Sequence, residues 1–152
     1  MQYSELNWIP EFPGSGWHRA KLFFPNGYGI SVVKWTGDPY YTNLYDYGLC
    51  ETAIVIGTEG GWFFPHDMPS HLRTHQDEQE VNNTLKEVES LPSISERQLA
   101  SLGQELIKAE LEHQLANEES PGHDDSIWRE MLQERFAIMS AIVYPKKQKG
   151  GV

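Results

Sequence analysis

Apolar and polar positions alternate along the first part of the chain. Residues 18–24 and 28–35 place apolar side chains at every second position, and further apolar, β-branched runs occupy 49–57 and 62–64. A period of two is typical of strands with one buried face. Asn26-Gly27, between the first two runs, is typical of a two-residue type I′ turn with positive φ at both residues. We therefore predict an antiparallel β-meander of three to four strands.

In the second part of the chain, apolar residues recur with the period of an α-helix. The pattern predicts a short helix over 77–90, a second helix to about residue 117, and a third that begins at Asp124 or Asp125 and ends near residue 143. Only about seven residues join the second and third helices. Such a short connection favours an antiparallel αα-hairpin.

Two overlapping capping boxes precede the second helix, and they pair Ser93 with Glu96 and Ser95 with Gln98.

The last helix carries a surplus of apolar side chains, because a second row lies beside the row that would face its neighbour. This row must pack on the sheet, on the first helix or on a second copy of the chain. It consists of Ile127, Met131, Ile138 and Ile142.

These elements define an α+β fold, in which the sheet is followed by the short helix and then by the long αα-hairpin. A chain of 152 residues is suited to one domain. Proline and glycine make the first residues irregular, with Trp8 and Phe12 as anchors. The predicted organisation is an irregular arm over 1–16, a single domain over 17–143 (sheet 17–65, helices 77–143) and a disordered basic tail over 144–152.

The net charge of −10 comes from one window of the sequence. Residues 76–125 hold thirteen acidic and three basic residues, whereas the rest of the chain has nine of each sign. An acidic surface repels nucleic acid and attracts a basic protein surface, although it also suits a merely solvated helix. We take Glu105, Glu110 and Glu112 as candidate partner-binding residues.

Neither the hydropathy nor the cysteine content indicates a membrane or secreted protein. No apolar run approaches 18 residues, and residues 1–5 lack the features of a signal peptide, so we expect no membrane span and no secretion. Cys50 is the only cysteine, which favours a reducing cytosol. Because Cys50 falls within a predicted strand, we expect a buried structural thiol and not a nucleophile.

A second candidate partner surface is a tyrosine-rich connection between two predicted strands. Tyrosine provides a large contact area at a low entropic cost, so these side chains suit recognition of a partner or packing over the sheet edge. The segment has no basic residue, which makes nucleic-acid stacking a poor expectation. Its tyrosines are Tyr40, Tyr41, Tyr45 and Tyr47.

Three histidines form a candidate metal site. His71 and His75 are four residues apart, a spacing that on a helix directs both rings at one ion, and His66 could supply a third ligand. The segment lacks the glutamate of the His-Glu-x-x-His pattern, and neighbouring prolines make it irregular. A polar connector is the alternative, and we expect no cofactor.

A tyrosine-rich connection joins two sequence blocks, Asn26-Gly27-Tyr28-Gly29-Ile30-Ser31-Val32-Val33 and Leu49-Cys50-Glu51-Thr52-Ala53-Ile54-Val55. Together they resemble a set of small uncharacterised bacteriophage proteins. The match covers about 35 residues. It implies a phage gene product that acts in the cytoplasm of a host bacterium. No activity or site residue is carried over from this set.

The function expected from these observations is that of a non-catalytic phage accessory protein. It would bind and modulate a host protein with a basic surface, for example as an anti-defence or anti-CRISPR-like inhibitor. Two alternatives stay open. One is a small metal-binding protein or metalloenzyme that uses His66, His71 and His75. The other is a virion structural or assembly protein, and a homodimer through the helical hairpin is compatible with either role.

Overall fold

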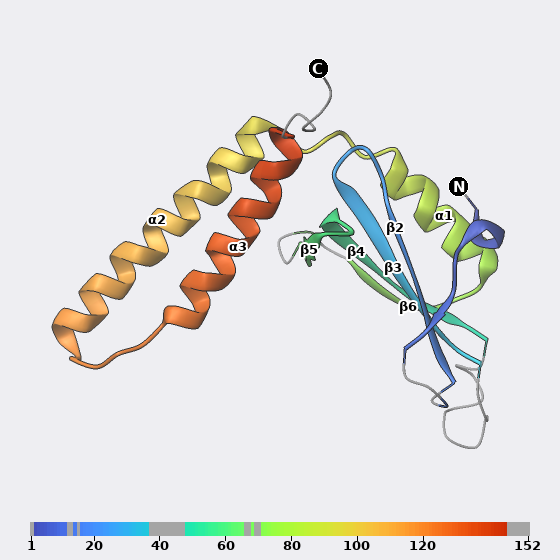
Figure 1. Cartoon of the computed structure of the whole chain (residues 1–152), viewed down its shortest axis with the longest axis horizontal. Coiled ribbons are helices and arrows are strands. Elements are labelled where there is room, and N and C mark those ends of the chain that lie inside the picture. The colour runs from blue at the N-terminus through green and yellow to red at the C-terminus, as the bar shows by residue number, and fades with distance from the viewer. Residues whose placement is uncertain are drawn as a thin grey trace, which may run out of the picture. The chain divides into compact units, whose positions relative to one another are not determined.

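A computed structural model describes residues 2–11, 14, 16–36, 48–65, 68 and 71–145. The chain forms two compact units, Met1–Ser93 and Ile94–Val152, which are treated separately below. The α+β class is confirmed, because an antiparallel sheet is followed by three helices (Figure 1). The predicted single domain over 17–143 spans both units and stays a prediction.

The sheet of the first unit has more strands than the sequence predicts. Its order is β1-β2-β3-β4-β5, and β6 pairs with β4 outside this path. Both β5 and β6 pair with β4, β5 at Ile56–Thr58 and β6 at Cys50–Ala53. The strands are β1 Ile9–Pro10, β2 Trp17–Phe23, β3 Tyr28–Trp35, β4 Cys50–Thr58, β5 Gly61–Phe63 and β6 Leu72–Gln76.

Two of these strands lie where no strand was predicted. The arm over 1–16, expected to be irregular, contains a 3₁₀ turn η1 (Tyr3–Glu5) and the short edge strand β1. The connector before the first helix contains β6. β1 has only two residues, which is too short to show an alternating pattern, and it pairs with the neighbouring strand β2. β6 is fixed by pairing with residues of β4 that are distant in sequence, so no local pattern of hydrophobicity indicates it.

The turn between β2 and β3 differs from the predicted type I′ turn. Gly27 has a φ of 92°, but among the described non-glycine residues only His75 has a positive φ, so Asn26 does not. The Gly27 amide donates to Phe24 O (3.2 Å) and the Phe24 amide donates to Tyr28 O (2.8 Å). Three residues therefore form the loop, a geometry in which only the last residue needs the left-handed conformation.

The side chain of Asn26 explains why this turn is adopted. Asn26 is buried, its Oδ1 accepts from the Tyr28 amide (3.0 Å), and its Nδ2 donates to Val88 O (2.8 Å) and Leu91 O (3.0 Å). Val88 lies in the last turn of the first helix and Leu91 just beyond it, where carbonyl groups lack the amide donors of a continuing helix; Val88 O also accepts from the Leu91 amide (3.2 Å), and Asn26 adds a donor to both carbonyl groups. The turn thus caps a helix that is about 60 residues away in sequence.

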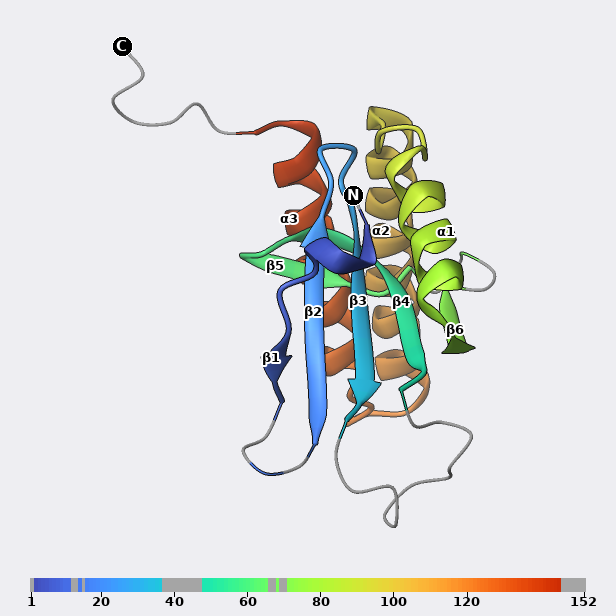
Figure 2. The same cartoon turned by 90° about the vertical axis from the view of Figure 1, so that its right-hand side faces the viewer.

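This helix, α1 (Glu78–Glu89), covers one face of the sheet (Figure 2). Asp77 and Glu80 form a capping box at its start. Val81, Leu85 and Val88, the residues with the predicted helical spacing, are completely buried. Burial of each such side chain is worth roughly 1.5–3 kcal/mol, which makes this row the main attachment of α1.

A polar network joins α1 to the strands beneath it. Thr52 Oγ1 donates to Gln76 Oε1 (2.6 Å), and Gln76 Nε2 donates to Thr84 Oγ1 (3.3 Å). Arg73 on β6 forms a bidentate pair with Glu87 on α1, at 2.7 and 2.9 Å. Buried polar groups are costly without partners, so these bonds fix the register of α1 on β4 and β6.

The second unit is the predicted αα-hairpin, formed by α2 (Glu96–Glu119) and α3 (Ser126–Val143). The capping box of Ser95 with Gln98 is confirmed, and Ser95 is the N-cap. At the start of α3, the Asp124 carboxylate accepts from the Ser126 amide (2.9 Å). Four apolar side chains of the two helices are buried, namely Leu99, Ala109, Leu132 and Met139.

Candidate interaction surfaces

Several predicted site residues lie outside the described part of the chain. Tyr40, Tyr41, Tyr45 and Tyr47 all fall in the segment 37–47, and His66 falls in 66–67. The recognition role of the tyrosine segment therefore stays a prediction.

His71 and His75 do not lie on a helix, which the candidate metal site would require. His71 directly precedes β6, and His75 lies within it, at a φ of 56° beside a register irregularity opposite β4. Residues four apart on a strand are separated by roughly 13 Å, too far to share one ion through their rings alone. Across the described residues, no three His, Cys, Asp or Glu side chains are grouped so as to hold a metal.

Cys50 is buried, as the sequence predicts. Burial raises the pKa of its thiol above the ordinary value, and the Tyr3 hydroxyl is its hydrogen-bond partner. A raised pKa keeps the group in the thiol form, which is a poor nucleophile. The environment of Cys50 is therefore that of a structural core residue.

The N-terminal arm is held by a cationic contact that the sequence does not reveal. Lys34 Nζ lies 4.2 Å from the centre of the Trp8 ring and donates to the Tyr3 hydroxyl (2.9 Å). The Tyr3 amide donates to Asn82 Oδ1 on α1 (2.7 Å). Trp8 thus serves as the anchor that was expected of it. Sequence reasoning missed Lys34. The sequence shows the aromatic residues Tyr3 and Trp8 in the arm, but it does not show which cation contacts their rings.

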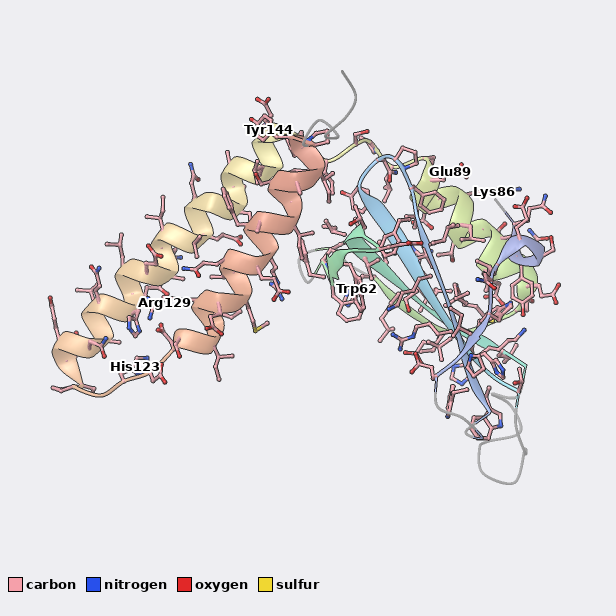
Figure 3. The ribbon with its side chains drawn as sticks, viewed as in Figure 1. Trp62, Lys86, Glu89, His123, Arg129 and Tyr144 are labelled. Carbon is pink, nitrogen blue, oxygen red and sulfur yellow. The ribbon has the colours of Figure 1, made fainter. Side chains whose placement is uncertain are left out.

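The sheet face opposite α1 carries a group of aromatic side chains. Trp17 and Trp35 meet edge to face with their ring centres 5.0 Å apart. Lys21 Nζ lies 4.6 Å from the centre of the Trp62 ring on β5, and Trp62 meets Phe64 at 5.3 Å (Figure 3). These residues pack largely on one another and on Lys21, so we assign them to the stability of the sheet.

The acidic window is divided between the two units. Its part in the first unit, residues 76–93, holds five acidic residues and one basic residue, and its part in the second unit, 94–125, holds eight and two. The net charges are −4 and −6. The expectation that the charge belongs to one helical segment is therefore corrected, and the larger share belongs to the hairpin.

The three glutamates proposed as partner-binding residues do not share one side of α2. Glu105 and Glu112 are exposed and seven residues apart, so they share one line along the helix, which Glu119 continues. Glu110 is only half-exposed. It lies on the line of Gly103, where an added Cβ would come within 3.1 Å of the Phe136 ring on α3. Glu110 thus borders α3 and belongs to another surface.

Polar side chains join the two helices near their connection. His113 pairs with Asp125, and its Nε2 lies 3.0 Å from Asn117 Nδ2 and 3.4 Å from Arg129 Nη2. Arg129 and His123 lie at this end of the hairpin in Figure 3. The network ties α2 to α3 where few apolar side chains are buried between them.

The hairpin leaves an unusual number of large apolar side chains in solvent. Six of them have exposed fractions between 40% and 75%. Single exposed apolar residues are normal, but a group of them beside charged residues is typical of interaction sites. The six are Ile107, Leu111 and Leu115 on α2 and Ile127, Trp128 and Met131 on α3.

Among the described helices, none is long and apolar enough to cross a membrane. No family model, curated protein or solved structure matches the chain.

Proposed function

We propose that this protein is a non-catalytic phage accessory protein that binds a host protein complex in the bacterial cytoplasm and modulates it. The observation that carries the proposal is the set of exposed apolar side chains of the αα-hairpin together with the acidic line of Glu105, Glu112 and Glu119 on the same hairpin. The hairpin buries four apolar side chains and exposes six large ones. A partner that covers some of the exposed side chains would gain apolar contact area at a low cost in desolvation.

The acidic line defines the partner as a protein with a basic surface. Carboxylates along a helix steer an oppositely charged surface toward it and repel nucleic acid. A basic groove that normally holds nucleic acid would fit this surface, which gives an anti-defence inhibitor a simple way to compete. The phage setting is supported by the resemblance of the Asn26–Val33 block to bacteriophage proteins.

Charge reversal tests the proposal. We expect Glu105→Lys/Glu112→Lys to weaken capture of a host complex by the full chain and to flatten the salt dependence of the binding, because screening acts over about 8–10 Å at physiological salt. The matched control is Glu118→Lys/Glu130→Lys, which changes the net charge equally at exposed positions elsewhere on the hairpin.

Two results decide the outcome. A folded test variant that binds the same complex with unchanged affinity and salt slope would exclude the acidic line as the binding surface. Equal weakening by the control variant would show that only net charge matters, and it would also contradict the proposal.

A virion structural or assembly role is a second candidate, and the row of Ile107, Leu111 and Leu115 favours it. These residues are four positions apart and more than half exposed, so they form one apolar line that a second copy could cover. Cofractionation with phage particles, together with a dimer or larger assembly in light scattering that Leu111→Glu converts to a monomer, would favour this role over host binding.

A further inference from the structure

The two broad sides of the hairpin differ in composition. One side is defined by the contact of Phe136 with Gly103 and by the contact of Arg129 with His113. A step of one residue turns a helix by about 100°, so the residues just before this line lie on the other side. For α2 these are Ala109 and Ala116, which precede Glu110 and Asn117, and for α3 they are Trp128 and Arg135, which precede Arg129 and Phe136.

This other side is called the Trp128 face below. It combines small residues, carboxylates and large apolar side chains in adjacent lines. Trp128 is 49% exposed and Met131 is 40% exposed, whereas Ala109 is buried. Glu112 and Glu119 are exposed and seven residues apart on the α2 border. Around Trp128 the face consists of Ala109, Glu112, Ala116 and Glu119 on α2 and of Trp128 and Met131 on α3, and Arg135 lies two turns further along α3 on the line of Trp128.

Each component restricts the kind of partner that fits. A small, partly exposed residue such as Ala116 allows the backbone of a third helix to approach closely, because the distance between packed helix axes, about 8–10 Å, is shortest where the side chains at the contact are small. A half-exposed tryptophan is the residue type most often found as an energetic anchor of an interface. Two carboxylates separated by two helical turns match basic side chains at the same spacing on a helix.

The carboxylates of the face are available to a partner. Lys108 Nζ lies 4.0 Å from Glu112, but both side chains are well exposed, at 77% and 65%. Such exposed i,i+4 pairs contribute little and exchange readily with another cation. Two basic side chains seven residues apart on a partner helix would therefore meet Glu112 and Glu119, one carboxylate each.

We propose that the Trp128 face binds one amphipathic α-helix of the partner protein, a helix with an apolar stripe flanked by Lys or Arg seven residues apart. The apolar stripe packs on Trp128, Met131 and Ala116, above the buried Ala109, and the basic residues pair with Glu112 and Glu119. This inference rests on the proposed function, since it specifies the chemistry of the host partner.

Two synthetic helices test the inference on the full chain. One peptide of about 20 residues carries a leucine stripe flanked by lysines two turns apart. The other carries glutamates in place of those lysines. We expect the lysine peptide to bind at least about tenfold more tightly, as measured by fluorescence anisotropy of the labelled peptide.

The variants locate the binding. Trp128→Ala should weaken binding of the lysine peptide about 30-fold, as expected for an interface anchor. Glu112→Lys/Glu119→Lys should reverse the preference in favour of the glutamate peptide. The matched control Glu118→Lys/Glu130→Lys should retain the preference for lysine, and circular dichroism confirms that each variant is folded. A reversal of preference in a folded variant cannot result from unfolding.

The outcomes separate this inference from the proposed function. Equal affinity for the two peptides, or full affinity in folded Trp128→Ala, overturns the helix-binding face. If host capture persists in the Trp128→Ala and Glu112→Lys/Glu119→Lys variants, the proposed function stands without this face. If peptide selectivity is as expected but no host complex is bound, the proposed function fails and the helix-binding face remains.

Discussion

Replacement of Asn26 is the sharpest test of how the first unit is built. Asn26→Ala removes the donor to Val88 O and Leu91 O and the acceptor of the buried Tyr28 amide. Each lost hydrogen bond costs about 1 kcal/mol, and a buried group left without a partner costs about 1–3 kcal/mol. We expect the free energy of unfolding of the sheet unit to fall by about 3 kcal/mol.

Asn26→Asp separates the two roles of this side chain. The carboxylate can still accept from the Tyr28 amide, but it cannot donate to the helix carbonyls at neutral pH. It also adds a negative charge at the C-terminal end of α1, where the helix dipole is already negative. The aspartate variant should therefore be at least as destabilised as the alanine variant at pH 7.

Urea unfolding followed by tryptophan fluorescence measures both variants. In a Trp128→Phe background the remaining tryptophans, Trp8, Trp17, Trp35 and Trp62, all belong to the first unit. The midpoint should then report the sheet unit, with an unchanged m-value. An aspartate variant within about 0.5 kcal/mol of the parent would show that Asn26 serves only the local turn and that its bond to α1 contributes nothing.

Three further changes probe the turn, an ion pair and the buried thiol. Gly27→Val should cost more than about 1 kcal/mol of unfolding free energy in the same assay, because a β-branched residue is strained at a φ of 92°; an unchanged midpoint would mean that the turn is misassigned. Arg73 lowers the pKa of Glu87, so the pair stabilises the fold above the ordinary carboxyl pKa and its contribution is lost as the pH falls through the lowered pKa. Because Glu87 is about half exposed, Glu87→Gln should cost only about 0.5 kcal/mol at pH 7 and nothing once the pH lies below the lowered pKa of Glu87, and a pH-independent difference would contradict this. Cys50 should react with a thiol reagent only at the rate at which the sheet unit opens, and rapid labelling of the folded protein would show that its burial is overestimated.

Local sequence patterns predicted the parts of this protein that depend on neighbouring residues. The rows on α1 and the capping box at Ser95 involve residues three to seven positions apart, so the hydrophobic period and the cap chemistry are visible in the sequence itself. The central strands β2, β3 and β4 are equally evident, because alternation within each run is a local property. For the same reason the exposed carboxylates of α2 could be named, although not their orientation.

The failures share one physical cause, which is contact between distant segments. His71 and His75 have the spacing of a helical metal site, but pairing with β4 draws this segment into the sheet as β6. The helical period already places Glu110 on another side of α2 than Glu105 and Glu112, but only the packing of α3 on Gly103 decides that this side borders α3.

Asn26 shows the division most clearly. The sequence alone determined that a tight turn occurs at Asn26-Gly27, because glycine readily adopts positive φ and polar turn residues separate two strand patterns. Tertiary structure decided which turn it is, because the carbonyl groups at the end of α1 need a donor and Asn26 supplies it from the turn. The sequence determines what each residue can do over a few positions, and the choice among those options is made by the unsatisfied polar and apolar groups that folding brings next to it.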